Sequence, residues 1–464
     1  MPVHLGSMGE SIKTVVRKNA GRMKPGDVYV LNDPYNGGTH LPDVTVVTPV
    51  FSEDESDIIF YVGSRGHHAD IGGITPGSMP PFSKTVEDEG VLLDNVKLVD
   101  GAGGGVMLEA DMRARLAGAR YPARNPDQNI ADLRAQIAAN EKGVQELRRM
   151  VAHFGLAVVN AYMRHVQDNA EESVRRIIGT LRDGEFAYEM DNGAIIKVKI
   201  SIGADLRSAT IDFTGTSAEL ESNFNAPSAV VYAAVLYVFR MLVDSDIPLN
   251  AGCLKPLTII IPEGSMLNPH PPAATVAGNV ETSQCITDAL IGALGVMAAS
   301  YGTMNNVTFG NDQYQYYETV SGGTGAGVLG TRPDGSLVGY DGCDTVQAHM
   351  TNSRLTDPEI LEWRYPVRVE EHSIRPGSGG SGKWRGGNGA TRRIRFLEPM
   401  TAAILAGHRR VPNFGMAGGA AGGLGRTWIE RVDGSRTLLA YSDETQVNAG
   451  DIFVLETPGG GGYG

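Results

Sequence analysis

The sequence predicts an α+β protein made of several subdomains. Short strand-like runs separated by glycine-rich turns dominate both ends of the chain, whereas apolar residues recur at helical spacing through its middle. The 464 residues are too many for one ordinary hydrophobic core, so we expect two or three packed units. Their predicted ranges are 1–125, 126–184 and 185–464.

The first unit is predicted to be rich in strands and turns. Asp27–Leu31 alternates apolar and polar residues and stops at an Asn-Asp-Pro turn signal. Val44–Phe51 and Ile58–Val62 are two further β-rich runs. Glycine-rich segments after these strands carry three of the ten histidines, and His4 adds a fourth, which makes this unit the first candidate for chemistry.

The second unit has a helical pattern. Apolar side chains recur every three or four residues, and charged or amide side chains fill the opposite face. We interpret residues 127–181 as two or three amphipathic helices with a break near Gly155. Such a unit fits a scaffold or a subunit interface better than an active site.

The third unit is predicted to mix strands, helices and glycine turns into an α+β domain. Glycine makes up 60 of the 464 residues, about 13% against a usual level of about 7%. Clusters such as Gly377–Gly389 and Gly459–Gly464 are expected to form tight turns buried against a neighbour. The expected strands are Ala194–Ile202, Ala209–Phe213, Leu257–Ile261, Val367–Glu371, Arg393–Leu397 and Ile452–Glu456, and the expected helices are Val230–Val243 and Thr282–Ala299.

Charge and hydropathy exclude several classes of partner. The formal net charge of −13, with no basic run, argues against nucleic acid. The longest apolar stretch, Ala226–Val243, is interrupted by Pro227 and Arg240, so no membrane span is expected. The N-terminus has no charged region followed by an apolar run, so no signal peptide is expected. The three widely spaced cysteines form no CxxC pair, which favours reduced thiols in a cytoplasmic protein.

The strongest chemical signal is a group of imidazoles and carboxylates in two glycine-flanked segments. His40 and Asp43 lie in GGTHLPD, and His67, His68 and Asp70 lie in RGHHADIGG, on two loops that each follow a predicted strand. Imidazole plus carboxylate is the ligand set for zinc, manganese or iron(II). Because polar loops also use His and Asp to cap turns, both interpretations stay open on composition alone.

Other chemistries find less support in the sequence. No GxxxxGK[ST] motif occurs, and Gly377–Gly389 precedes a strand, whereas a P-loop precedes a helix. No GxSxG nucleophile elbow is present, and Cys343 has no activating neighbour in sequence. In GNVETSQ, Thr282 or Ser283 is expected to cap the following helix. A plain helix start is favoured there over polar groups aimed into a cleft.

Several motifs resemble the hydantoinase B/oxoprolinase family. The matching stretches span the chain and are PVHLGSM (2–8), NDPYNGGTHLPD (32–43), SRGHHADIGGITPGSMPP (64–81), EDEGV (87–91), ADLRAQIAANEKG (131–143), GNVETSQ (278–284) and TPGGGGYG (457–464). The third and fifth look closest to the 5-oxoprolinases. The acetone carboxylases of the same superfamily have a motif resembling LHQYD where this chain has GHHAD.

The resemblance implies an ATP-dependent cyclic amide hydrolase, of the 5-oxoprolinase or N-methylhydantoinase type, that works in two parts. A hydantoinase A-type subunit or domain phosphorylates the lactam carbonyl oxygen with ATP and magnesium, and the half resembled here opens the activated amide at a divalent metal. The implied ligands are His40, Asp43 and His67, while His68 and Asp70 are candidates for orienting ligands or relaying protons. We expect a cytoplasmic hetero-oligomer that is inactive without its partner.

One departure from the family pattern bears on this site. Family members usually begin several tens of residues before PVHLGSM, in a stretch that adds an acidic residue to the centre, whereas here PVHLGSM follows Met1. A three-ligand site of weaker metal affinity is one expected result. Two alternatives remain open, namely a subunit of an acetone- or acetophenone-type ATP-dependent carboxylase and a truncated non-catalytic scaffold.

Overall fold

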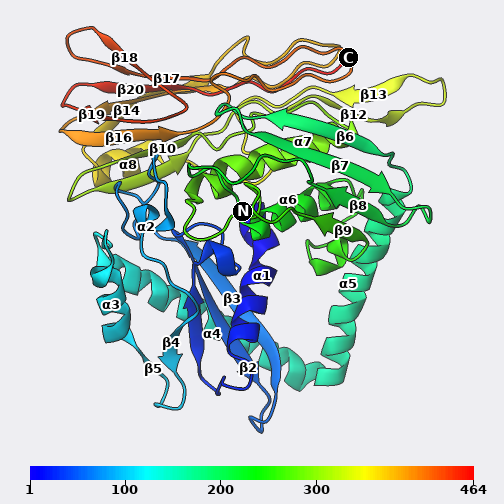
Figure 1. Ribbon diagram of the computed structural model, residues 1–464, viewed down its shortest axis with the longest axis vertical. Coiled ribbons are helices and arrows are strands. Elements are labelled where there is room, and N and C mark those ends of the chain that lie inside the picture. Colours follow the sequence, from blue (N-terminus) through cyan, green and yellow to red (C-terminus); the bar gives the residue numbers. More distant parts are fainter.

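A computed structural model describes residues 1–464 and shows helices and sheets arranged in layers (Figure 1). An N-terminal sheet with helices beside it lies at one end of the molecule, further helices occupy the middle, and sheets with glycine-rich segments form the opposite end. This mixture of helices and separate sheets confirms the α+β prediction. The division into three units stays a prediction.

The N-terminal sheet is antiparallel and has a helix on each face. Its strands are β1 (Val28–Leu31), β2 (Asp43–Phe51), β3 (Ile58–His67), β4 (Val96–Asp100) and β5 (Val106–Met107), in the spatial order β3-β2-β1-β4-β5. Gly63 of β3 faces Met8 and Ile12 of α1 (Pro2–Lys18), whereas Gly66 faces Gln136 of α4 (Pro126–Phe154). Because side chains alternate along a strand, odd-numbered residues at this end of β3 face α1 and even-numbered residues face α4.

Helix α1 was not predicted, and the expected strand-and-turn character of the first residues is wrong there. Its buried face includes the small polar residues Ser7, Ser11 and Thr14 beside Val3 and Val15, so few of the buried residues are apolar. Arg65 of β3 donates to the hydroxyls of Ser7 and Ser11. A Cβ at Gly6 would lie 2.5 Å from Ala233, so the absence of a side chain lets α1 approach the central helix that carries Ala233.

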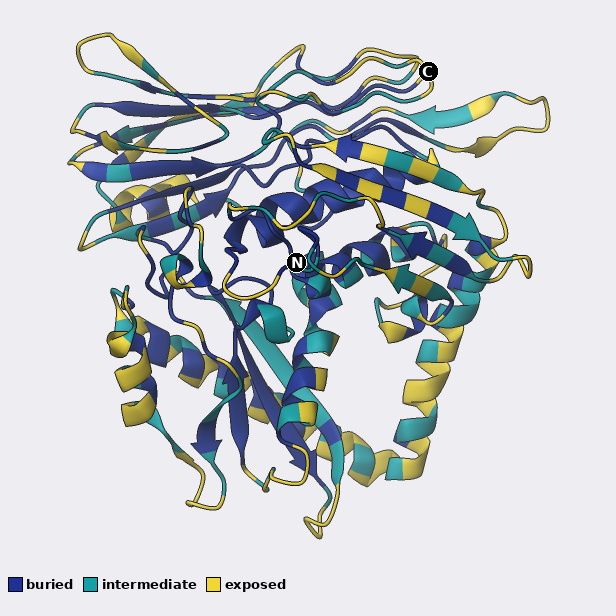
Figure 2. Cartoon of the chain, viewed as in Figure 1, coloured by how far each residue is buried: buried dark blue, intermediate teal, exposed yellow.

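The predicted amphipathic helices are present as α4 and α5 (Leu156–Ile178), and the break falls at Gly155 as expected. Asn125 caps α4 by accepting from the backbone N–H of Gln128, and Gly155 has a φ of 83° that a residue with a side chain rarely adopts. Much of α5 is exposed (Figure 2). No helix of the structure is long and apolar enough to cross a lipid bilayer.

The largest hydrophobic core, 42 residues, surrounds two buried helices in the middle of the molecule, α6 (Ser228–Met241) and α7 (Ser283–Leu294). The predicted extension of α7 to Ala299 is wrong, because the chain turns into the left-handed region at Gly295 (φ 66°). The shorter helices are α2 (Val86–Glu89), α3 (Glu109–Gly118) and α8 (Pro358–Arg364).

Four further sheets complete the fold. The first is β6 (Gly184–Glu189), β7 (Ile195–Ile202), β8 (Ala209–Asp212) and β9 (Leu257–Ile260); the second is β10 (Asn306–Gly310), β11 (Gln315–Thr319), β16 (Met400–Leu405) and β19 (Ser442–Val447). The third is β14 (Val367–Ile374), β15 (Ala390–Phe396), β17 (Arg426–Glu430), β18 (Arg436–Leu439) and β20 (Ile452–Glu456), and the fourth is the hairpin of β12 (Gly327–Thr331) and β13 (Leu337–Tyr340). All pairs are antiparallel except β8 with β9.

The glycine clusters pack backbone against backbone beside the C-terminus, where several irregular segments run side by side (Figure 1). The tail Gly459–Gly462 is fully buried and lies among them. Gly460 N donates to Gly387 O at 3.0 Å, and Gly461 N donates to Ala299 O at 2.8 Å. A Cβ on Gly460 would lie 2.0 Å from the Thr324 carbonyl oxygen, so the glycines permit a close approach of chains.

We therefore predict that Gly460→Ala lowers the free energy of unfolding by about 3 kcal/mol, the upper range for overpacking a buried site. Gly118→Ala is the matched control, because a Cβ at that helical position meets nothing within 4 Å. Its effect should stay within about 1 kcal/mol. Urea unfolding of both variants measures the difference, and equal stabilities would contradict the packing described.

Candidate metal centre

The pairing of β2 with β3 positions two of the candidate ligands. Asp43 is the first residue of β2 and His67 the last of β3, and the two lie directly opposite each other in the antiparallel ladder. Side chains of opposite residues project from the same face of a sheet. This is the face toward α1, because Arg65, two residues before His67, contacts that helix. His67 was expected on a loop, but it belongs to the strand itself.

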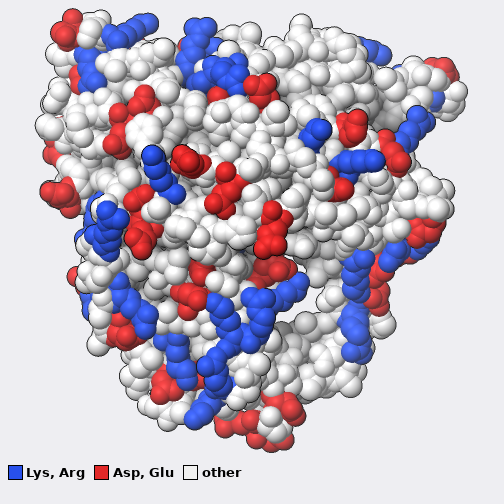
Figure 3. All heavy atoms as spheres, viewed as in Figure 1, with Lys and Arg blue, Asp and Glu red and all other residues white.

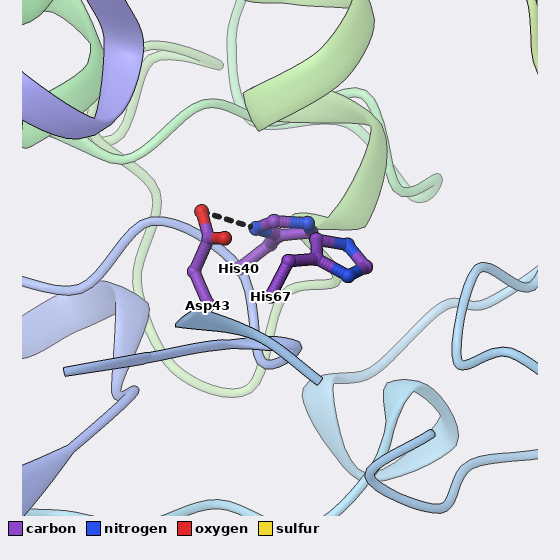
Figure 4. A group of neighbouring side chains, drawn as sticks. All are labelled: His40, Asp43 and His67. Carbon is purple, nitrogen blue, oxygen red and sulfur yellow. Dashed lines mark ion pairs between the residues drawn. The ribbon is translucent and has the colours of Figure 1, made fainter. Parts of the chain in front are cut away.

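His40 joins the other two from the turn before β2. Asp43 N donates to the carbonyl of His40 at 3.1 Å, which closes the turn. His40 Nδ1 lies 3.0 Å from Asp43 Oδ2, and the rings of His40 and His67 have centroids 5.1 Å apart. One ligand atom from each residue lies within 4.8 Å of the others. Figure 4 shows the three side chains grouped together, with the His40–Asp43 ion pair dashed.

Each residue of the cluster has a buried atom with no hydrogen-bond partner: both ring nitrogens of His40, Asp43 Oδ1 and His67 Nε2. Buried polar atoms in proteins are nearly always paired. The other oxygen of the carboxylate, Oδ2, accepts a hydrogen bond from Thr39 Oγ1 at 2.8 Å. Two imidazole nitrogens and one carboxylate oxygen fit the donor set of zinc, manganese or iron(II) and leave coordination positions for other ligands.

The protonation states also suit a cation. Burial alone would raise the pKa of the Asp43 carboxyl, but the imidazoles of His4 and His40 hold that pKa well below its usual value. Burial, with the neighbouring His40, lowers the pKa of His67 to about 3. At neutral pH the centre therefore contains a carboxylate and a neutral His67 ring, the forms that bind metal.

Two residues beside the centre were not among the candidates. His4 Nε2, on α1, lies 3.1 Å from Asp43 Oδ2, and Asn279 Nδ2 donates to the same oxygen at 3.4 Å. Both contacts fall on Oδ2 and leave Oδ1 free. The two residues lie far from Asp43 in sequence, so only their membership of PVHLGSM and GNVETSQ could have signalled them.

The segment that carries Asn279 does not form the plain helix start that was expected. Gly278–Thr282 is a π-helical turn (η3) running into α7, and neither Thr282 nor Ser283 caps that helix with its side chain. The Thr282 hydroxyl instead donates to the Phe224 carbonyl at 2.7 Å. The wider π turn places Asn279 at the centre, and such turns are frequent at functional sites.

A cavity of about 350 Å³ opens beside the cluster. Its walls come from α1, the end of β3, η3, β11 and the region of α8, and the lining residues are Met1, His4, His67, Ala69, Asn279, Val280, Gln315, Tyr316, Tyr317, Ser353, Thr356, Arg364 and Tyr365. The His67 ring stacks on Tyr317, with centroids 4.8 Å apart and planes 8° from parallel. The volume of the cavity suits a small molecule.

Tyr317 is held in turn by a buried chain of hydrogen bonds. Its hydroxyl donates to Asn306 Oδ1 at 2.8 Å, and Asn306 Nδ2 donates to Glu281 Oε1 at 2.8 Å. Glu281 lies on η3, two residues after Asn279, and burial raises the pKa of its carboxyl to about 8. Glu281 is therefore mainly uncharged at neutral pH. Through Asn306 it links the π turn to Tyr317, the ring that stacks on His67.

The sequence profile described as Hydantoinase B/oxoprolinase matches residues 1–464. The chain belongs to this family. The 5-oxoprolinase of Dictyostelium discoideum is 43% identical over 476 residues, which cover 100% of this chain and 36% of that protein. The chain therefore spans little more than a third of the length of this curated relative.

Two solved structures have the same fold as this hydantoinase B/oxoprolinase chain. The ATP-dependent caprolactamase of Pseudomonas jessenii has a TM-score of 0.83 at 24% identity and is covered to 81%, while this chain is covered completely. An acetone carboxylase in its nucleotide-free form has a TM-score of 0.84 at 18% identity. The match covers all of this chain and 68% of the carboxylase chain. At these identities the likeness describes the fold alone.

His68 and Asp70, the other candidates of this family's GHHAD segment, lie outside the cluster. His68 follows the alternation of β3 toward α4, where its Nδ1 lies 2.9 Å from Asn129 Nδ2. Its backbone N–H donates to Pro42 O at 2.8 Å. Asp70 accepts from Arg124 Nη1 at 2.8 Å. Neither side chain lines the cavity, and both connect the ligand-bearing segments to their surroundings.

We predict that Glu281→Gln weakens the pH dependence of stability. The carboxyl binds its proton more tightly in the folded state than in the unfolded state, where its pKa is near 4.5, so its stabilising effect is lost as pH rises toward about 8. The uncharged amide removes that loss. Urea unfolding at pH 5, 6.5 and 8 should show a smaller decline for this variant than for the wild type.

Glu263→Gln is the control, since that side chain is 84% exposed. The free energy of unfolding of this control should decline with pH as it does in the wild type. If the stability of Glu281→Gln declines with pH as steeply as that of the wild type, the buried carboxyl does not hold the proton assigned to it.

Proposed function

We propose that this chain opens the cyclic amide of 5-oxoproline, or of a closely related lactam or hydantoin, once the carbonyl oxygen has been phosphorylated with ATP elsewhere in the enzyme. The observation that carries the proposal is the convergence of unpartnered atoms from His40, Asp43 and His67 beside a small-molecule cavity. Similarity over the whole of this chain to about a third of a 5-oxoprolinase supports the choice of substrate. Phosphorylation suits the chemistry, because it turns a poor amide electrophile into one with a good leaving group.

In this proposal His40, Asp43 and His67 hold a divalent zinc, manganese or iron ion. Such an ion supplies Lewis acidity toward a carbonyl oxygen or a water molecule. Three other groups hold the Asp43 carboxylate in place, because Thr39, His4 and Asn279 contact its Oδ2 and leave Oδ1 without a partner. Hydrogen bonds of this kind tune and orient metal ligands.

His4 is proposed to hold and move a proton. Its ring lines the cavity and contacts Asp43, and imidazole is the commonest general acid or base in enzymes. His68 and Asp70 are proposed to position the ligand-bearing segments, because their contacts run to α4 and to Arg124 rather than into the cavity.

We propose that ATP and magnesium bind to a hydantoinase A-type part, either a separate subunit of a hetero-oligomer or a fused domain. Two observations support this division. The sequence has no GxxxxGK[ST] motif, and the chain corresponds to only 36% of the Dictyostelium discoideum 5-oxoprolinase. A cytoplasmic location is proposed from the three cysteines, none of which forms a disulfide.

Metal analysis tests the centre directly. Purified wild-type chain should contain about one divalent ion per chain, and His67→Ala should lose most of it because one of three protein ligands is removed. His153→Ala is the matched control, since that histidine is exposed on α4, and it should retain the ion. Circular dichroism checks the folding of each variant. A wild-type chain that binds no first-row metal would contradict the proposal.

Turnover tests the activity. The chain assembled with its ATP-handling partner should hydrolyse ATP in step with 5-oxoproline opening. His40→Ala should lower turnover at least about 100-fold, because one of the three proposed metal ligands is lost. His153→Ala should retain full turnover. Unchanged activity in the His40 variant would instead indicate a scaffold, and incorporation of labelled bicarbonate into a ketone would indicate a carboxylase.

A further inference from the structure

The cavity beside the metal centre has a distinct charge pattern. The chain carries 53 acidic and 40 basic residues, and both kinds are interspersed over the face in Figure 3. Yet none of the 13 residues that line the cavity is an aspartate or a glutamate. The lining instead includes the guanidinium of Arg364, with imidazole, hydroxyl and amide groups around it. A guanidinium with no carboxylate in the same wall favours an anionic ligand.

Arg364 is the one permanently charged side chain of this lining. It forms no ion pair and no side-chain hydrogen bond within the chain, in contrast to the buried Arg392, which is paired with Glu318 at 3.1 Å. Its guanidinium therefore has all of its donors available. A guanidinium presents parallel N–H groups that match the two oxygens of a carboxylate.

The backbone that carries Arg364 is fixed at the cavity edge. Arg364 ends α8, whose Leu361 is fully buried, and Tyr365 N donates to Leu361 O at 2.9 Å. The Tyr365 ring packs against Tyr316, with centroids 5.0 Å apart. The neighbours of Arg364 thus anchor the end of the helix in the wall, while the arginine side chain itself remains exposed.

We propose that the cavity selects lactams that carry a carboxylate, and that Arg364 is the specificity-determining residue that binds this carboxylate. The inference rests on the proposed function and names the substrate class of the same site. 5-Oxoproline has a carboxylate on its ring, whereas unsubstituted lactams are neutral. One cavity is lined both by Arg364 and by His67 and Asn279, so a bound molecule can contact the arginine while its amide faces the metal centre.

The test compares two substrates of the chain assembled with its ATP-handling partner. 2-Pyrrolidinone has the ring of 5-oxoproline without the carboxylate. Arg364→Gln should raise the KM for 5-oxoproline about 10- to 100-fold, the range expected when a charge-assisted hydrogen bond is lost, with little change in kcat. Arg364→Lys should recover part of this loss. The kcat/KM for 2-pyrrolidinone should stay the same in all three proteins.

Arg354→Gln is the matched control, because Arg354 is also exposed and lies ten residues earlier but does not line the cavity. It should behave as wild type with both substrates, and metal content should be equal in all variants. An unchanged KM for 5-oxoproline in Arg364→Gln would overturn the inference. So would an equal loss with both substrates, which would mean that Arg364 binds the phosphate of the activated lactam instead.

Failure of the proposed function gives a different result. A wild-type complex that opens no lactam would contradict the proposed activity itself, before any variant is compared. If the wild type opens 5-oxoproline but does not prefer it to 2-pyrrolidinone, only the proposed role of the carboxylate is contradicted.

Discussion

The register of the β2–β3 pair is the constraint on which the candidate site depends. Asp43 and His67 face each other across the ladder at the point where β2 begins and β3 ends. A slip of one residue would turn each side chain of the slipped strand to the other face of the sheet. His68 would then project toward α1, and His67 would project toward Gln136 and Asn129, which now surround His68. The donor set therefore exists only in this register.

Parts of the chain that are distant in sequence complete the centre. Helix α1 brings His4, η3 brings Asn279, and β11 brings Tyr317, which stacks on His67. The contacts of His4 and Asn279 fall on a single oxygen of Asp43, so the second oxygen remains available. The fold itself does not choose a reaction, since the caprolactamase and acetone carboxylase structures resemble this chain to nearly the same degree.

Local sequence patterns predict the elements and residues whose interactions are short in range. The three-residue spacing of His40 and Asp43 and the long amphipathic helices around Gly155 could be read directly. The position of His67 within β3 could not, because the glycines and Arg65 near the end of that strand obscure its alternation. Helix α1 escaped prediction because its buried face carries serines that bind Arg65. Tyr317 reaches the centre only through tertiary packing, for which no local pattern exists, and Asn279 could be signalled only by its membership of GNVETSQ.

The proposed function requires one ion shared by side chains from the two strand ends. X-ray absorption spectroscopy of the metal-loaded wild-type chain tests this most directly, because it reports the atoms bound to the metal. We predict two imidazole nitrogens and at least one carboxylate oxygen at about 2.0–2.2 Å. A spectrum without imidazole scattering would place the metal elsewhere and contradict the account.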